Sequence, residues 1–250
     1  MVAGFDKFRE AFRAYSDNYI VIGGSACDWL MSHESVPFRA TKDIDLVIVA
    51  DNLDASFVRA VWDFVSAGGY SAYVRKDGRR CLYRFLSPTV AGYPFMMEFF
   101  SRAPIDFAIA PQSVITPIPV GEDDVSSLSG ILLDENYYEF IKSCAKVIDG
   151  VTVLSFEALL ILKARAWMDL SARKARGEFV KDRDLAKHRK DVLRLQTMIP
   201  DGARPMLPRP VRNDFEEFLE VYVKHPTDPS SLNVPGTFEE AIAHIRRVFC

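Results

Sequence analysis

Two aspartates, Asp43 and Asp45, stand at the start of the apolar run DIDLVIV, which covers residues 43–49. Side chains alternate across a β-strand, so residues two apart share one face, roughly 6.6 Å apart along the backbone, while Ile44 points to the other face. Two carboxylates on one face pack poorly in a core but bind cations well. Hard divalent ions such as Mg²⁺ or Mn²⁺ take oxygen ligands, and a pair of such ions can stabilise the attacking and leaving oxygens of a phosphoryl or nucleotidyl transfer.

A Gly-Gly-Ser sequence, Gly23, Gly24 and Ser25, supplies the other half of such a site. Glycines at a strand-to-helix turn let the backbone approach a phosphate closely. Ser25 can cap the following helix, and the free N–H groups at the helix start, together with the helix dipole, attract anionic oxygens. A triphosphate would therefore bind between this turn and the metal ions that the two aspartates hold.

Regular elements must position these residues. We expect YIVIGG (19–24) and IDLVIV (44–49) to form neighbouring strands, joined by a helix that starts at Ser25 and then by a polar loop. Aromatic residues at three- and four-residue intervals predict a first helix near residues 5–15, and a second helix is expected over residues 53–67. A hairpin that turns at Asp77-Gly78 should follow.

A third acid, Glu98, interrupts the apolar strand that is predicted within YPFMMEFFSR, residues 93–102. A carboxylate surrounded by Met and Phe is costly to bury without a partner. Glu98 therefore either pairs with an arginine at an edge or joins Asp43 and Asp45 around the metal. The residues alone leave both choices open.

The order of these features resembles the signature of the nucleotidyltransferase (polymerase-beta-like) superfamily, in which GGS follows one strand and DID opens the next. GGSA together with TKDIDLVI is similar to the AbiEii/AbiGii toxin group of bacterial nucleotidyltransferases. The resemblance implies an α+β fold with a mixed-sheet nucleotidyltransferase core at residues 1–150 and a helical domain at residues 151–250 that completes the nucleotide cleft. It also implies that Glu98 is the third metal-binding carboxylate, although an aspartate is commoner there.

The C-terminal part of the chain is helical and locally basic. Between residues 163 and 194, eleven Lys and Arg stand against five acids. Judged by charge alone, these Lys and Arg residues would lie on solvent-exposed faces of helices. However, KARAWMDL and KDRDLAKHRKDVLRL look like downstream motifs of the AbiEii-like group. This resemblance implies that Lys163 contacts the triphosphate, and that Asp182 or Asp184, with Lys187, borders the base or the acceptor.

The composition of the chain narrows the remaining classes of protein. At 250 residues, 49% hydrophobic and with a net charge of -3, the chain is an ordinary globular protein rather than a general nucleic-acid binder. No apolar run approaches the roughly 20 residues of a membrane span, and charges interrupt the N-terminus where a signal peptide needs apolar residues, so we expect a cytoplasmic protein without a membrane partner. Four cysteines without C-x-x-C spacing argue against zinc and disulfides. A second acidic cluster, Asp123 and Asp124, is predicted as a solvated loop.

The implied activity is metal-dependent transfer of a nucleoside monophosphate from an NTP to a hydroxyl, with release of pyrophosphate. As the toxin of a toxin–antitoxin system, the enzyme would modify a tRNA 3′ end or a protein hydroxyl and would have a cognate antitoxin. Two alternatives stay open. One is a small-molecule nucleotidyltransferase of the antibiotic-modifying kind, and the other is a regulatory module that binds nucleotide without turnover.

Overall fold

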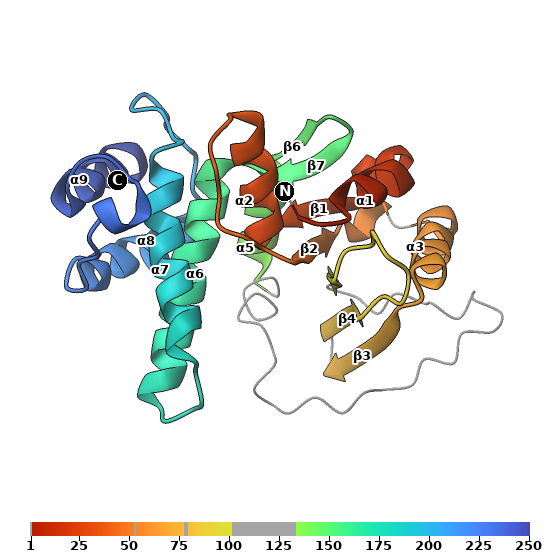
Figure 1. The fold of residues 1–250 in the computed structure, drawn as a ribbon. Helices are drawn as coiled ribbons and strands as arrows, with labels where there is room; N and C mark the ends of the chain where they lie inside the picture. Colours follow the sequence, from red (N-terminus) through yellow and green to blue (C-terminus); the bar gives the residue numbers. More distant parts are fainter. Residues whose placement is uncertain (1, 53, 78–79, 102–133) are drawn as a thin grey trace. The chain divides into compact units, whose positions relative to one another are not determined.

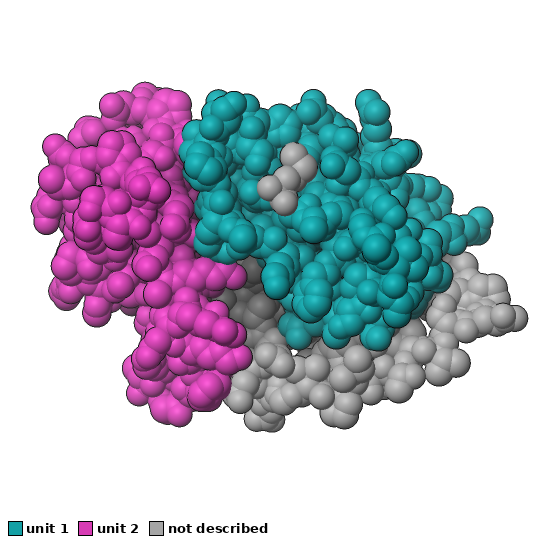
Figure 2. All heavy atoms as spheres, viewed as in Figure 1, with its two compact units in different colours: residues 1–121, 144–154 teal, residues 122–143, 155–250 magenta. Residues whose placement is uncertain are grey.

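The computed structural model describes residues 2–52, 54–77, 80–101 and 134–250 (Figure 1). The chain divides into two compact units (Figure 2). The first, here called the sheet unit, comprises residues 1–121 and 144–154, and the second, the helical unit, comprises residues 122–143 and 155–250. The predicted acidic cluster at Asp123 and Asp124 lies outside the described residues.

The sheet unit is built on a mixed seven-stranded sheet with the strand order β3-β4-β5-β2-β1-β7-β6 in the described part of the chain. β1 runs antiparallel to β2 and parallel to β7, and β2 runs parallel to β5. The predicted neighbouring strands and hairpin are therefore confirmed, and the α+β class is correct. The strands are β1 Tyr19–Ile22, β2 Asp43–Ile48, β3 Ser71–Asp77, β4 Arg80–Leu86, β5 Met96–Ser101, β6 Ala145–Ile148 and β7 Val151–Leu154.

Two helices, α1 (Phe5–Phe12) and α3 (Ala55–Gly68), cover the face of the sheet to which Ile44 points. From α1, the ring of Phe8 lies 5.4 Å from that of Tyr19 on β1. From α3, the ring of Trp62 lies 5.9 Å from that of Phe85 on β4. Because this face is packed with apolar side chains, the aspartates at the start of β2 point to the opposite face.

Strands β6 and β7 form a tight hairpin that spans residue 150, the expected boundary of the core. β6 and β7 turn at Asp149 and Gly150, whose φ angles are 50° and 78°, as a two-residue type I′ turn requires. Val153 on β7 pairs with Val21 on β1. Residues 151–154 therefore belong to the sheet.

The helical unit consists of amphipathic helices that pack around an aromatic core. α6 begins directly after its N-cap residue Ser155, whose hydroxyl accepts a hydrogen bond from the Ala158 N–H at 3.4 Å. α6 and α7 form a helical hairpin (Figure 1). In the described residues no helix is long and apolar enough to cross a membrane. The helices are α5 Glu135–Ser143, α6 Phe156–Ala175, α7 Asp182–Gln196, α8 Arg209–Tyr222 and α9 Phe238–Phe249.

Candidate functional site

The three predicted carboxylates lie on one face of the sheet. β2 and β5 are parallel, and their register places Asp45 directly opposite Glu98, with Asp43 two residues earlier on the same face of β2. Neighbouring strands are about 4.8 Å apart, so the side chains of Asp45 and Glu98 start as neighbours. The structure thus brings Glu98 to the strand and register that a third carboxylate would need.

Asp45 also meets the Gly-Gly turn, where β1 passes into α2 (Gly23–His33). Gly23 has a φ of +69°, and a Cβ built on it would lie 2.1 Å from Asp45 Oδ2. A Cβ on Gly24 would lie 2.9 Å from Thr41 Oγ1, in the loop before β2. The positive φ at Gly23 favours glycine, and at both positions an added Cβ would force a neighbouring group to move. The start of α2 and one aspartate of the acidic pair therefore come together in space.

Ser25 has a different local role from the predicted helix cap. α2 begins at Gly23 rather than at Ser25, with Ile22 as its N-cap residue, and among the described residues no side chain caps it. The Ser25 hydroxyl instead donates a hydrogen bond to the carbonyl oxygen of Ile22 at 3.1 Å, and Ser25 is buried. The prediction that Ser25 caps the helix was wrong because the glycines themselves form the first turn. The first N–H groups of α2 remain suited to an anion, since a helix start leaves such groups without intrahelical partners.

The donor set of Asp43 and Asp45 fits one hard divalent cation. Both side chains are partly exposed. Mg²⁺ in proteins usually takes one or two carboxylates, keeps several waters and completes its shell with substrate phosphates. In the described part of the chain no group of three or more His, Cys, Asp or Glu is arranged to hold a metal. The metal-binding roles of Asp43, Asp45 and Glu98 stay predictions.

Glu98 is engaged by an arginine that sequence reasoning did not identify. Glu98 Oε1 accepts a hydrogen bond from Arg84 Nε at 2.6 Å and forms an ion pair with Arg84 Nη2 at 2.5 Å. This is one of the two arrangements that the sequence left open for Glu98. The residue letters could not single out Arg84, because several arginines lie in the same hairpin and only the register of β4 against β5 places this one opposite Glu98.

Lys163, the predicted triphosphate contact, lies inside the helical unit. Its Nζ is 3.4 Å from Asp191 Oδ2, and the exposed fractions of the two side chains are 6% and 0%. Asp191 Oδ1 also lies 3.5 Å from Arg194 Nη1, one turn later on α7. The ion pair links α6 to α7, which is a structural role, and the predicted contact of Lys163 with a triphosphate stays a prediction.

This ion pair leads to a stability prediction. Lys163→Met should lower the free energy of unfolding by about 2 kcal/mol, because Asp191 would stay buried after losing its ion pair with Lys163. Lys163→Met combined with Asp191→Leu should recover part of that loss, since two apolar side chains replace a buried ion pair well. Urea unfolding of the three proteins measures these differences in stability. Equal stabilities of wild type and Lys163→Met would show that the pair contributes nothing to the fold.

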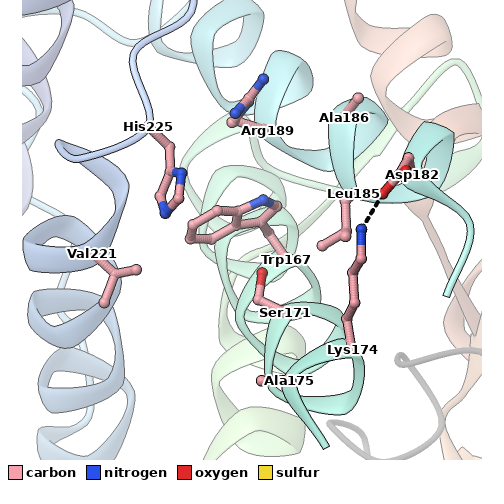
Figure 3. Close-up of a pocket in the computed structure, with 10 residues that line it drawn as sticks. All are labelled: Trp167, Ser171, Lys174, Ala175, Asp182, Leu185, Ala186, Arg189, Val221 and His225. Atoms are coloured by element: carbon pink, nitrogen blue, oxygen red, sulfur yellow. Dashed lines mark hydrogen bonds and ion pairs between the residues drawn. The ribbon is translucent and has the colours of Figure 1, made fainter. Parts of the chain in front are cut away.

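Asp182, predicted to border the base or acceptor, lines a cavity of about 550 Å³ within the helical unit (Figure 3). Trp167 from α6 forms one wall, and His225 faces it with a ring-to-ring distance of 5.5 Å. Asp182 is bound by Lys174 in an ion pair. Lys187 is exposed and lies on α7 outside the set of residues that line this cavity. The roles predicted for Asp182 and Lys187 stay predictions.

At the other end of α2, His33 is held through both ring nitrogens. Nδ1 bonds the carbonyl oxygen of Trp29 at 2.8 Å, and Nε2 bonds Asp149 Oδ2 at 2.9 Å in the β6–β7 turn. Both acceptors favour the doubly protonated ring, so the backbone bond first, and then the Asp149 bond, raise the pKa of His33 above its ordinary value of 6.5. His33 therefore links α2 to the edge of the sheet, and both contacts favour the protonated ring.

A pH dependence follows from this raised pKa. The stabilising contribution of His33 should be fully present below the unfolded-state pKa, about 6.5, and should be lost as the pH rises through the higher folded-state pKa. Asp149→Asn should lower the His33 pKa and reduce the stability difference between acidic and basic pH. NMR titration of the His33 ring measures the first effect, and denaturant unfolding across the pH range measures the second. An unchanged His33 pKa in the variant would exclude the contact.

Comparisons with known proteins add little to this geometry. No protein-family model matches the chain, and a search of curated proteins gives no significant match. Among solved structures, the chain is similar to the crystal structure of an antigenic nucleotidyltransferase-like protein from Paracoccidioides brasiliensis, with 14% sequence identity and a TM-score of 0.45. The alignment covers 98% of this chain and 95% of that chain. A likeness at this level does not decide function, so the proposal below depends on the site itself.

Proposed function

We propose that this protein is a metal-dependent nucleotidyltransferase that moves a nucleoside monophosphate from an NTP to a hydroxyl acceptor. The observation that carries the proposal is the close approach of Asp45 Oδ2 to Gly23 at the start of α2, with Asp43 on the same face. A cation held by two aspartates and a helix start that favours anions then meet at one place. A nucleoside triphosphate with its bound divalent cation supplies both ligands: the cation binds the aspartates, and the phosphates bind the helix start.

Each residue of the site has a proposed role in the transfer. Asp43 and Asp45 hold Mg²⁺ or Mn²⁺, which when bound neutralises charge on the phosphates. The backbone at Gly23 and Gly24 lets the β and γ phosphates approach the start of α2. The acceptor oxygen forms a bond to the α-phosphorus, and the bond from that phosphorus to the bridging oxygen breaks. Pyrophosphate leaves with the bonding electron pair, and the acceptor proton passes to solvent.

The proposed biological role is that of a toxin enzyme with a cognate antitoxin, whose acceptor is a tRNA 3′ end or a protein hydroxyl. The similarity of GGSA and TKDIDLVI to the AbiEii/AbiGii group supports this role. The basic α6–α7 hairpin suits an acceptor with a phosphate backbone. Expression should arrest bacterial growth, and Asp43→Asn should relieve the arrest. Normal growth at a verified expression level would count against the toxin role alone.

Incubation with labelled nucleotide tests the activity directly. Purified protein and Mg²⁺ are mixed with each α-labelled NTP in turn, and total cellular RNA, protein extract and aminoglycoside-type small molecules are offered as acceptors. We expect label in RNA or protein. Label in the small molecules would instead identify an antibiotic-modifying enzyme. No label in any acceptor, together with no nucleotide binding, would contradict the proposal.

A second candidate function is nucleotide binding without turnover. The specific observation in its favour is that Glu98 is paired with Arg84 rather than turned to the two aspartates. Such a module would bind an NTP with Mg²⁺ and release it unchanged. Measurable nucleotide affinity without pyrophosphate release from any NTP would identify it.

A further inference from the structure

We propose that the cavity of the helical unit binds a small aromatic molecule that carries one anionic group, a carboxylate or a phosphate (Figure 3). The cavity volume of about 550 Å³ lies within the range of small-molecule sites, whereas packed interiors leave few voids larger than a water molecule. The residues that line the cavity all belong to the helical unit, which therefore forms this site alone. Binding here does not depend on nucleotide transfer at Asp43 and Asp45.

Two helix faces form most of the cavity wall. Trp167, Ser171 and Ala175 are four residues apart on α6, so they share one face of that helix. Ala186 and Arg189 are three residues apart on α7 and likewise share a face. The two helices pack together as a hairpin, but small side chains stand at three of these five positions. The cavity is the space that these small side chains leave open.

Trp167 forms the buried, aromatic wall of the cavity (Figure 3). Its ring meets the rings of Phe218 and Tyr222 on α8 edge-to-face, at ring-to-ring distances of 5.8 and 5.9 Å. These contacts hold the indole in place. His225 is exposed and meets the same indole edge-to-face at 5.5 Å. A planar ring in the cavity would therefore find aromatic contacts from the indole and the imidazole at one place.

Arg189 gives the cavity a positive charge that no described residue neutralises. Its Nε is buried without a hydrogen-bond partner, and in the described part of the chain no carboxylate oxygen lies within 4.0 Å of its guanidinium nitrogens. The lysine of the lining, Lys174, is instead paired with Asp182. A guanidinium stays charged at physiological pH and binds carboxylates and phosphates with charge-assisted hydrogen bonds. The charge of the lining thus favours an anion.

The apolar part of the lining requires more of the ligand than its charge. Leu185, Ala186 and Val221 are each partly exposed at the cavity. Apolar surface is covered favourably by a hydrophobic body and not by a bare, hydrated anion. Inorganic phosphate alone would therefore bind more weakly than an aromatic acid. A carboxylate or phosphate joined to an aromatic ring satisfies both the apolar wall and Arg189.

Calorimetric titration of the full chain in EDTA tests the site. The anionic probes are indole-3-acetate, 2-naphthoate and AMP, and their uncharged counterparts are indole-3-acetamide, 2-naphthamide and adenosine. We expect at least one anionic probe to bind, and its uncharged counterpart to bind at least about tenfold more weakly, the effect of losing one charge-assisted hydrogen bond. Binding of the carboxylates without AMP would identify an aromatic carboxylate site, and binding of AMP without the carboxylates would identify a mononucleotide site.

Three variants locate the binding. Arg189→Gln should weaken the anionic probe at least about tenfold, and Ala186→Leu, which fills the cavity without changing the charge, should weaken the charged and uncharged probes alike. Arg183→Gln removes an exposed arginine of the same helix and should bind as the wild type does. Melting curves establish that each variant is folded.

Several results would overturn the proposal. These are no binding of any anionic probe, equal affinities for the charged and uncharged probes, and wild-type affinity in a folded Arg189→Gln. Inorganic phosphate that binds as tightly as the aromatic anions would also overturn it. The comparisons between probes use the wild type and need no variant to fold. Because EDTA removes divalent cations, failure here leaves the proposed metal-dependent transfer untouched, and loss of that function would leave this site in place.

Discussion

Replacing Asp45 with Asn should reduce nucleoside-monophosphate transfer by at least about 1000-fold, because a metal ion contributes several kcal/mol of charge stabilisation and each 1.4 kcal/mol is tenfold in rate. Asn has nearly the same shape as Asp, so its contact with Gly23 is retained and the melting temperature should change little. Asp43→Asn should have a similar effect, because the two side chains share one face of β2. Initial rates with the labelled NTP and calorimetric melting curves measure the two quantities.

An exposed aspartate provides the control for this prediction. Asp63 lies on the solvent side of α3. Asp63→Asn removes the same charge and should leave transfer and Mn²⁺ binding unchanged. Mn²⁺ binding should be lost in Asp45→Asn together with transfer. Full transfer in both Asp43→Asn and Asp45→Asn would remove the metal assignment.

Gly23→Ala should lower the free energy of unfolding by about 2–5 kcal/mol, the sum of left-handed backbone strain and overpacking. The new Cβ would lie 2.1 Å from Asp45 Oδ2, and the φ of +69° disfavours any L side chain. Either the turn or the aspartate must move. Transfer should therefore fall as well, because both halves of the proposed site are displaced. Urea unfolding and initial rates measure the two effects.

Gly177 offers a matched control for the steric contact between a Cβ at position 23 and Asp45. It has a φ of +84°, and a Cβ built on it meets nothing within 4 Å. Gly177→Ala should cost only the left-handed strain, about 1–2 kcal/mol. The difference between the two variants isolates the contact with Asp45. Equal destabilisation, with transfer retained in Gly23→Ala, would mean that Asp45 does not press against the turn, and the observation that carries the proposed function would be lost.

Local patterns were sufficient for the elements of this protein. The sequence predicted helices near α1 and α3, and short apolar runs predicted the strands that carry Asp45 and Glu98. These patterns show which side of a single helix or strand is buried, and residues close together in the sequence are enough to reveal that side. The sequence analysis placed the boundary between the core and the helical domain at residue 150. Residues 151–154 join the sheet through a pairing with β1, and short apolar runs do not reveal their partners.

The sequence by itself determined that Asp43 and Asp45 share a face, that Gly23 and Gly24 turn a strand into a helix, and that Glu98 needs a partner. Only the tertiary structure decided that Asp45 presses on Gly23, that Arg84 is the partner of Glu98, and that Lys163 pairs with Asp191. The physical reason is that the alternation of side chains between two faces follows from the sequence of one strand. The register, by contrast, depends on how two strands pair. Shifting β4 by one residue against β5 would turn Arg84 to the opposite face, and nothing in the local sequence forbids that shift.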